Sequence, residues 1–472
     1  MKILLVRPFI VPTEGISPPL SLLYLSSYLK DNNNQLEVSI IDSCIDKTLL
    51  KEISMDSVPI KNLIRDIKKL DPDIIGMTLF SSELNEISLL CRLMKRELSD
   101  CLIVLGGPHP TAMPEKTLEL IPECDFVIRG EGEIIFHDLI NNLIHKDAIR
   151  KVKGLSYRRD NIICSNDDAD IIANLDNIPF PDRRSLLYNY KNGTYGSFLF
   201  GSPIDIIITS RGCPFQCSYC FKVCPKYRSR SIKNVIDEID WIVKNIAPEY
   251  IYIMDDSFTA QRERCVKILD ALIEKKYGCN FRVRSRVDAV SKELLDKMKK
   301  AGVDIIVYGL ESGSQKMLDA FNKRTTVAQN IAACRLTRQA GINCFADMIL
   351  FYPGESKETL KETKRFIKIA RPILVQFHIL TPLPKTKIYE EARRNGTLVG
   401  DWGTLNQTPW IKTEEFNDLK IMEAISRKLL LKTLLTPHRI WWAMRYFGKR
   451  LLRNPSTFLK MIIYNFMIKR KY

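Results

Sequence analysis

The stretch Arg211-Gly212-Cys213-Pro214-Phe215-Gln216-Cys217-Ser218-Tyr219-Cys220 is the most informative part of the chain. Its cysteines have the spacing C-x3-C-x2-C in a single loop, directly after an apolar run at 204–209 that predicts a buried strand. This spacing can place Cys213, Cys217 and Cys220 on three irons of a cubane [4Fe–4S] cluster and leave the fourth iron without a protein ligand. A zinc site with Cys224 as the fourth ligand is the alternative, although structural zinc sites normally use paired C-x2-C units. Three inert buried thiols fit poorly beside glycine and proline.

The residues that follow predict a partial barrel. Strand candidates lie at 204–209, 250–254, 281–285, 305–308, 344–350 and 374–379. Helical patterns separate them, and the one at 291–301 is followed by Gly302, a typical residue just beyond a helix end. Six such units predict a TIM-like (β/α)6 barrel with its chemistry at the carboxyl ends of the strands.

The first 130 residues predict a second α/β domain. Apolar runs at 3–6, 38–41, 74–77, 102–105 and 126–128 lack polar alternation, which is typical of parallel strands covered on both faces. Helical patterns at 20–30 and 83–96 separate some of these runs. We therefore expect a doubly wound, Rossmann-like domain at 1–145, a hairpin and linker at 146–200, the barrel at 201–400, and a helical basic region at 401–472.

Composition limits the class of protein. The 472 residues are 45% hydrophobic and 27% charged, which excludes a disordered chain, and no apolar run reaches the roughly 18 residues of a membrane span. With no signal peptide, the thirteen cysteines are expected as reduced thiols or metal ligands in a cytoplasmic protein. Twelve Lys and Arg but no acidic residue occur at 424–472, so residues 1–423 carry only 16 − 12 = +4 of the net +16. A nucleic-acid partner is therefore not expected.

Three segments after the cysteine loop extend the pattern. They read Tyr252-Ile253-Met254-Asp255-Asp256-Ser257-Phe258, Arg284-Ser285-Arg286-Val287-Asp288 and Gly309-Leu310-Glu311-Ser312-Gly313-Ser314. Together with the loop they resemble, in order and position, the radical S-adenosylmethionine (SAM) superfamily. The resemblance implies that SAM chelates the open iron and is cleaved to a 5′-deoxyadenosyl radical. It implies SAM contacts from Tyr219, Asp255, Asp256, Arg286, Glu311 and Ser312. Phe351 departs from the family, because it occupies the place of a glycine before Pro353-Gly354-Glu355.

Glycines also follow two strands of the first domain, in Gly106-Gly107-Pro108-His109 and Gly130-Glu131-Gly132. They let a bulky ligand approach the backbone, and on composition alone a nucleotide or a flavin would serve as well. Beside Pro18-Pro19-Leu20, they resemble the cobalamin-binding domain that precedes many radical SAM enzymes. The resemblance implies cobalamin contacts from Gly106, Gly107, His109, Gly130 and Glu131.

The lower axial ligand of the cobalt is not expected to be histidine. After the second predicted strand the chain reads Asp42-Ser43-Cys44-Ile45-Asp46, with Cys44 where the methionine-synthase-type motif has its histidine. We interpret Cys44 as a buried thiol, with ligation of cobalt as the alternative. His109 is interpreted as a loop residue near the corrin.

The C-terminal region predicts a cationic amphipathic helix at 439–453. Its apolar face would be Ile440, Met444, Phe447 and Leu451, its basic face Arg445, Lys449 and Arg453, with Trp441 and Trp442 alongside. A second apolar stretch follows at 456–468. Such a helix suits the inner face of a membrane or an anionic partner; the alternative is a helix packed on the barrel with a solvated basic face.

The two resemblances together imply a cobalamin-dependent radical SAM enzyme, most simply a class B methyltransferase. One SAM would methylate Co(I), another would yield the radical, and the methyl group would pass to an unactivated carbon of a small-molecule or lipid-like substrate. A flavodoxin- or ferredoxin-type electron donor is implied. The alternatives are a cyclase or rearrangement enzyme with the same cofactors, an RNA methylthiotransferase, and a non-catalytic iron–sulfur or zinc scaffold.

Overall fold

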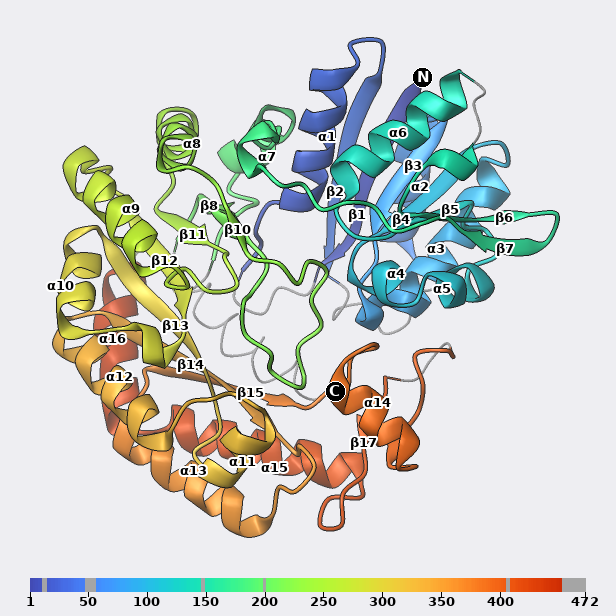
Figure 1. The fold of residues 1–472 in the computed structure, drawn as a ribbon. Coiled ribbons are helices and arrows are strands. Elements are labelled where there is room, and N and C mark those ends of the chain that lie inside the picture. The colour runs from blue at the N-terminus through green and yellow to red at the C-terminus, as the bar shows by residue number, and fades with distance from the viewer. Residues whose placement is uncertain (11–14, 47–56, 146–148, 198–200, 405–407, 452–472) are drawn as a thin grey trace. The chain divides into compact units, whose positions relative to one another are not determined.

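The computed structural model describes residues 1–10, 15–46, 57–145, 149–197, 201–404 and 408–451 (Figure 1). The chain divides into two compact units. Unit 1 comprises residues 1–192, 221–229 and 400–408, and unit 2 comprises residues 193–220, 230–399 and 409–472. Two short segments from the C-terminal two thirds of the chain therefore belong to the N-terminal unit.

Unit 1 is built on a seven-stranded sheet with the order β2-β1-β3-β4-β5-β6-β7. Its parallel strands are β1 (Lys2–Ile10), β2 (Glu37–Asp46), β3 (Ile74–Thr78), β4 (Leu102–Gly106) and β5 (Phe126–Ile128). All five apolar runs are confirmed as strands. The hairpin of β6 (Leu155–Arg159) and β7 (Ile162–Ser165) adds to the same sheet, because β6 pairs antiparallel with β5.

Helices cover both faces of this sheet, which explains why its strands lack polar alternation. On one face, α1 (Leu20–Asn32) and α6 (Gly132–Ile144) pack against strand residues such as Leu5 and Val104 (Figure 1). On the other, α2 (Val58–Leu70), α3 (Leu84–Glu97) and α5 (Pro114–Leu120) pack against residues such as Val6 and Leu105. The doubly wound class is confirmed.

Unit 2 is built on a six-stranded parallel sheet with the order β15-β14-β13-β12-β11-β8. Its strands are β8 (Ile204–Ile207), β11 (Tyr250–Ile253), β12 (Asn280–Ser285), β13 (Val303–Glu311), β14 (Asn343–Leu350) and β15 (Leu374–Ile379). All six predicted strands are confirmed. Each pairs with its neighbours in chain order, and β8 and β15 form the two edges, so the described strands make an open (β/α)6 barrel.

The helices of unit 2 lie on the outer face of its sheet (Figure 1). They are α8 (Ile232–Asn245), α9 (Arg262–Lys275), α10 (Lys292–Lys300), α12 (Val327–Gln339) and α13 (Lys357–Ala370). The short helix α11 (Gln315–Ala320) instead packs with Ile349 of β14 and Tyr352. Local signals fix their ends: the Ser291 side chain accepts a hydrogen bond from Leu294 N at the start of α10, and Gly302 follows its end with φ +87°.

The C-terminal region is helical, as predicted. It contains α14 (Lys387–Arg394), a small hairpin of β16 (Leu398–Val399) and β17 (Trp410–Ile411), α15 (Leu419–Leu434) and α16 (Pro437–Leu451). Part of the amphipathic helix predicted at 439–453 cannot be compared with the structure. Arg453 and the second apolar stretch at 456–468 lie outside the described residues, as do the side chains of residues 445–451. Within the described parts of the chain, no helix has the length and apolar character needed to cross a membrane.

Candidate functional site

The turn that leads into the cysteine loop is held by Asp255, which follows β11 and is 1% exposed. Its Oδ1 accepts hydrogen bonds from the backbone N–H of Thr209 (2.6 Å) and of Ser210 (3.1 Å). Its Oδ2 accepts from the hydroxyls of the same residues, at 2.5 and 2.7 Å. Arg264 of α9 supports the turn by donating to the Thr209 carbonyl (2.7 Å). Both oxygens of Asp255 are thus committed to the loop entrance.

The body of the loop is docked on residues that follow β12, β13 and β14. Ser218 N donates to the Phe321 carbonyl (3.0 Å), and the Ser218 hydroxyl lies 2.9 Å from the Tyr352 hydroxyl. The Arg286 guanidinium lies 3.9 Å from the ring centre of Phe215, between the first and second cysteines. The backbone between the cysteines is therefore fixed by unit 2 itself.

Tyr219 belongs to a buried polar cluster with Glu311 and Lys323. The Tyr219 hydroxyl donates to Glu311 Oε1 (2.7 Å), and Lys323 Nζ donates to the same oxygen (2.8 Å). The Glu311 and Lys323 side chains are 8% and 9% exposed. Burial raises the pKa of Tyr219 well above its ordinary value, so the phenol keeps its proton. Burial alone would lower the pKa of Lys323, but the Glu311 carboxylate and the Cys217 side chain together outweigh burial, and the pKa is raised.

Gly309 makes room for this cluster. A Cβ there would lie 2.4 Å from Glu311 Oε1 and 2.9 Å from Lys323 Nζ, far inside van der Waals contact. Sequence reasoning missed Lys323, which lies beyond α11 and outside every quoted motif. The glycine two residues before Glu311 was the one local sign of a crowded backbone at this point.

The other predicted SAM contacts take different positions. Arg286 also pairs with Asp288 (2.8 Å) and donates to the Lys323 carbonyl (2.8 Å). Ser312 is buried and lies 3.2 Å from the Thr363 hydroxyl of α13. Asp256 is exposed at the edge where β11 ends. The structure thus brings Tyr219, Arg286 and Glu311 to the cysteine loop, whereas Ser312 turns toward α13.

The cysteines fit a cluster better than a single ion. Cys213 and Cys217 are partly exposed and Cys220 is exposed. A cubane takes each thiolate on a different iron, so three cysteines in one exposed loop leave its fourth iron open, whereas structural zinc normally takes four ligands on one ion. The donor set therefore suits a [4Fe–4S] cluster.

Phe351 preserves the glycine-like backbone that its position requires. Its φ is +65°, and its buried side chain packs on Phe416, with ring centres 4.9 Å apart. Phe351 N donates to Glu355 Oε2, and burial raises the pKa of Glu355 to about 7. The substitution changes the side-chain packing of this turn while the backbone keeps the left-handed conformation.

In unit 1, the glycines after β4 and β5 form a cradle. Gly107 has φ +104°, and a Cβ there would lie 2.8 Å from Thr78 Cγ2. Gly130 has φ +86°, and its missing Cβ faces open space; a Cβ at Gly106 would make only ordinary contacts. The Thr111 hydroxyl joins the two loops, because it donates to the Gly107 carbonyl (2.7 Å) and accepts from Gly130 N (3.0 Å). A closely packed glycine, Gly107, and the open space at Gly130 suit a bulky planar ligand such as a corrin.

His109 is buried beside this cradle as a neutral imidazole. Its Nδ1 lies 2.9 Å from the Ser81 hydroxyl, and burial lowers its pKa to about 4. Its Nε2 is buried and has no hydrogen-bond partner among the described residues. The Trp402 ring packs edge-on against it, with ring centres 6.4 Å apart. An unpaired buried nitrogen beside the cradle fits a polar group on a cofactor. Trp402 was missed because it lies almost three hundred residues further along the chain.

Glu131 takes part in a buried ion pair. Its carboxylate accepts from Arg228 Nη1 (2.7 Å) and Nη2 (3.1 Å), with side-chain exposures of 6% and 5%. Ile172 N also donates to it (3.0 Å). Glu131 therefore fixes residues 221–229, which directly follow the last cysteine of the loop, to unit 1.

Cys44 lies within β2, because the strand extends to Asp46 and not only to Ile41 as predicted. Its φ is +49°, and burial raises its pKa to about 12. The thiol is half-buried, and its role remains the predicted one of a structural thiol, with ligation of cobalt as the alternative.

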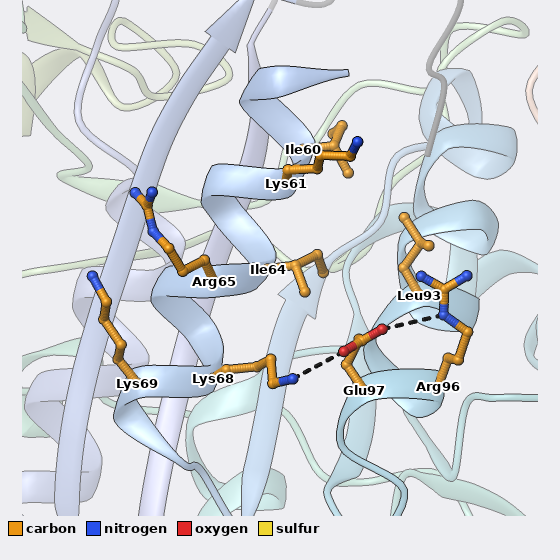
Figure 2. A pocket seen from close by; sticks show the side chains of 9 residues that line it. All are labelled: Ile60, Lys61, Ile64, Arg65, Lys68, Lys69, Leu93, Arg96 and Glu97. Carbon is orange, nitrogen blue, oxygen red and sulfur yellow. Dashed lines mark hydrogen bonds and ion pairs between the residues drawn. The ribbon is translucent and has the colours of Figure 1, made fainter. Parts of the chain in front are cut away.

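A groove of about 640 Å³ is lined by residues of α2 and α3 (Figure 2). Figure 2 shows Lys68 and Arg96 directed at Glu97, with N···O distances of 2.9 and 3.3 Å. These residues lie in the last turns of the two helices, and such turns stand at the amino ends of parallel strands. None of the residues that line the groove belongs to the glycine cradle, so the groove is not part of it.

Two known families match the chain. Residues 207–367 match the radical SAM superfamily, and residues 6–140 match the B12 binding domain. An uncharacterised methyltransferase of Pyrococcus horikoshii is 30% identical over 451 residues, which is 93% of each chain. The anaerobic magnesium-protoporphyrin IX monomethyl ester cyclase of Cereibacter sphaeroides is 32% identical, over 86% of this chain and 67% of the cyclase.

A solved structure shares the fold. The cobalamin-dependent SAM radical enzyme OxsB, with aqua-cobalamin and SAM bound, matches 99% of this chain and 71% of its own, with a TM-score of 0.73 and 21% identity. At this identity the likeness establishes the architecture.

Proposed function

The chain belongs to the B12-binding radical SAM enzymes, and on that premise we propose that it is a methyltransferase that acts on an unactivated carbon. Its cofactors are a [4Fe–4S] cluster, SAM and cobalamin. The observation that carries the proposal is the presence, in one chain, of a rigidly held three-cysteine loop and a glycine cradle with open space beside it. When bound, the cluster and SAM supply a 5′-deoxyadenosyl radical that removes hydrogen, and cobalamin carries the methyl group.

The chain's own residues position these groups. Asp255 orders the entrance of the cysteine loop, and the Tyr219–Glu311–Lys323 cluster orders its exit. Because the loop is already ordered, binding of the cluster costs little conformational entropy of the loop. Glu131 and Arg228 fix the segment after the loop to the unit that carries the cradle. We propose that Cys213, Cys217 and Cys220 hold the cluster and that Gly106, Gly107, His109 and Gly130 face the corrin.

A cyclase that uses the same cofactors is the second candidate, because a cyclase is 32% identical to this chain. Methyl transfer is favoured because the match covers more of the related methyltransferase than of the cyclase: the chain spans 93% of the methyltransferase but 67% of the cyclase. The substrate that we propose is a small or lipid-like molecule. Radical SAM enzymes need a reductant, and we propose a flavodoxin- or ferredoxin-type protein, with the enzyme in the cytoplasm at the inner face of the membrane.

The test is a label-transfer assay. The protein is purified without oxygen, reconstituted with iron, sulfide and cobalamin, and given SAM with a trideuterated methyl group together with separate lipid and soluble extracts. Methyl transfer predicts a product that gains all three deuteriums. Formation of 5′-deoxyadenosine with an unlabelled, altered product would instead establish the cyclase alternative. Cys217→Ala is the control, and it should form no 5′-deoxyadenosine.

A further inference from the structure

Helix α16 is attached to unit 2 by polar groups. Arg439 is 5% exposed and donates to the carbonyls of Pro372 (2.7 Å) and Thr433 (2.9 Å). Trp442 Nε1 donates to Asn343 Oδ1 (2.8 Å), at the first residue of β14. Arg439 and Trp442 therefore mark the inward face of the helix, at the end of the sheet opposite the cysteine loop.

The outward face of α16 is apolar. Ile440, Trp441 and Met444 are 43%, 57% and 59% exposed. At about 100° per residue these positions lie on one side of the helix, opposite Arg439 and Trp442. Leu435, at the end of α15, is 69% exposed. A helix on the surface of a globular protein normally buries its apolar stripe. Over the side chains that the structure describes, α16 instead buries Arg439 and exposes Ile440, Trp441 and Met444.

Charge indicates what covers this face. The region 424–472 carries twelve Lys and Arg and no Asp or Glu, so its partner is anionic. A nucleic acid or an acidic protein would satisfy the charge but would gain little from an exposed isoleucine and methionine. A bilayer with anionic headgroups satisfies both, since apolar side chains enter the interface, tryptophan favours that depth, and basic residues remain near the phosphates.

We propose that the outward face of α16, formed by Ile440, Trp441 and Met444, lies in the headgroup region of an anionic membrane. This inference rests on burial and charge in unit 2 and does not require methyl transfer. It differs from the sequence-based pattern, because Trp442 lies on the inward side and Trp441 on the outward side. The barrel then contacts the membrane through the end of its sheet that is opposite the cysteine loop.

The experiment is flotation of the full chain with vesicles of phosphatidylcholine, alone or mixed with phosphatidylglycerol. Wild type should float with the mixed vesicles only, and less so at high salt. Replacing all three residues by serine (Ile440→Ser, Trp441→Ser, Met444→Ser) should weaken binding by about 100-fold, from partial burial of three apolar side chains. A matched triple variant elsewhere (Val58→Ser, Ile162→Ser, Tyr188→Ser), at exposed apolar positions of unit 1, should bind like wild type.

Tryptophan quenching gives a local readout. Brominated lipids should quench part of the fluorescence of wild type, and Trp441→Phe should keep binding but lose most of this quenching. Failure to float, or equal flotation of the α16 triple variant and wild type, would overturn the proposal. Equal flotation, together with loss of binding when Lys469, Arg470 and Lys471 are changed to Gln, would assign the contact to the last residues. A wild-type dimer that the triple variant converts to a monomer would assign the face to a second copy.

Discussion

Replacing Asp255 with alanine tests whether this carboxylate holds the cysteine loop or contacts SAM. Asp255 accepts four hydrogen bonds from Thr209 and Ser210. The two hydroxyls can rotate to new acceptors, but the two backbone N–H groups cannot, and each buried unpaired group costs about 1–3 kcal/mol. The turn should therefore lose about 2–6 kcal/mol, enough to leave Cys213 without a fixed position. We expect most of the bound iron to be lost.

The assay measures iron and sulfide per chain after anaerobic reconstitution, and SAM binding per assembled cluster by equilibrium dialysis. Asp255→Asn is the discriminating variant. Its amide oxygen can replace Oδ1 as acceptor for both backbone N–H groups, and its NH2 can donate to the two hydroxyl oxygens. It should therefore assemble the cluster and bind SAM nearly as wild type does. Asp270→Ala removes a surface ion pair between Asp270 of α9 and Lys297 of α10, and it should change neither quantity.

Two results would refute this reasoning. If Asp255→Ala held iron at the wild-type level, the four hydrogen bonds would not be what orders the loop. If Asp255→Asn assembled the cluster but bound SAM much more weakly, the negative charge would act on SAM itself, as the family resemblance implies.

Three further predictions concern stability. The pKa of His109 is about 4 in the folded chain and near 6.5 in the unfolded chain, so between these pH values the unfolded chain binds one more proton. The free energy of unfolding, measured with urea, should therefore fall by about 3 kcal/mol as the pH falls from 6.5 to 4. His109→Gln should lack that loss, and an unchanged pH profile would contradict the assignment. Arg228→Met leaves the buried Glu131 carboxylate without its cation, which should cost about 3–5 kcal/mol in thermal unfolding. Glu131→Gln in the same chain should restore much of this loss, and additive losses would mean that the two residues act independently. Gly309→Ala displaces Glu311 from Tyr219 and Lys323 and should speed loss of the reconstituted cluster to a chelator; an unchanged rate would show that the cysteine loop does not depend on this contact.

Much of the fold could be predicted because it is encoded locally. A parallel strand covered by helices on both faces reads as an apolar run, so the five parallel strands of the seven-stranded first sheet and the six strands of the second stand out. The ends of the strands and the extent of the first sheet were harder to predict from the sequence. β2 continues to Asp46 because it pairs with β1 as far as Ile10, and the hairpin at 155–165 joins the first sheet through β5. Both extensions depend on a neighbouring strand that the local pattern does not contain.

The sequence by itself determined the cysteine loop, the order of the strands and helices, and the glycines after β4 and β5, because each is a pattern of close neighbours. Only the tertiary structure decided what the polar residues do. Asp255 and Glu131 stand where motifs predict ligand contacts, yet their oxygens are engaged by Thr209, 46 residues away, and Arg228, 97 residues away. A carboxylate takes the donors that packing brings nearest, and those donors come from distant segments of the chain.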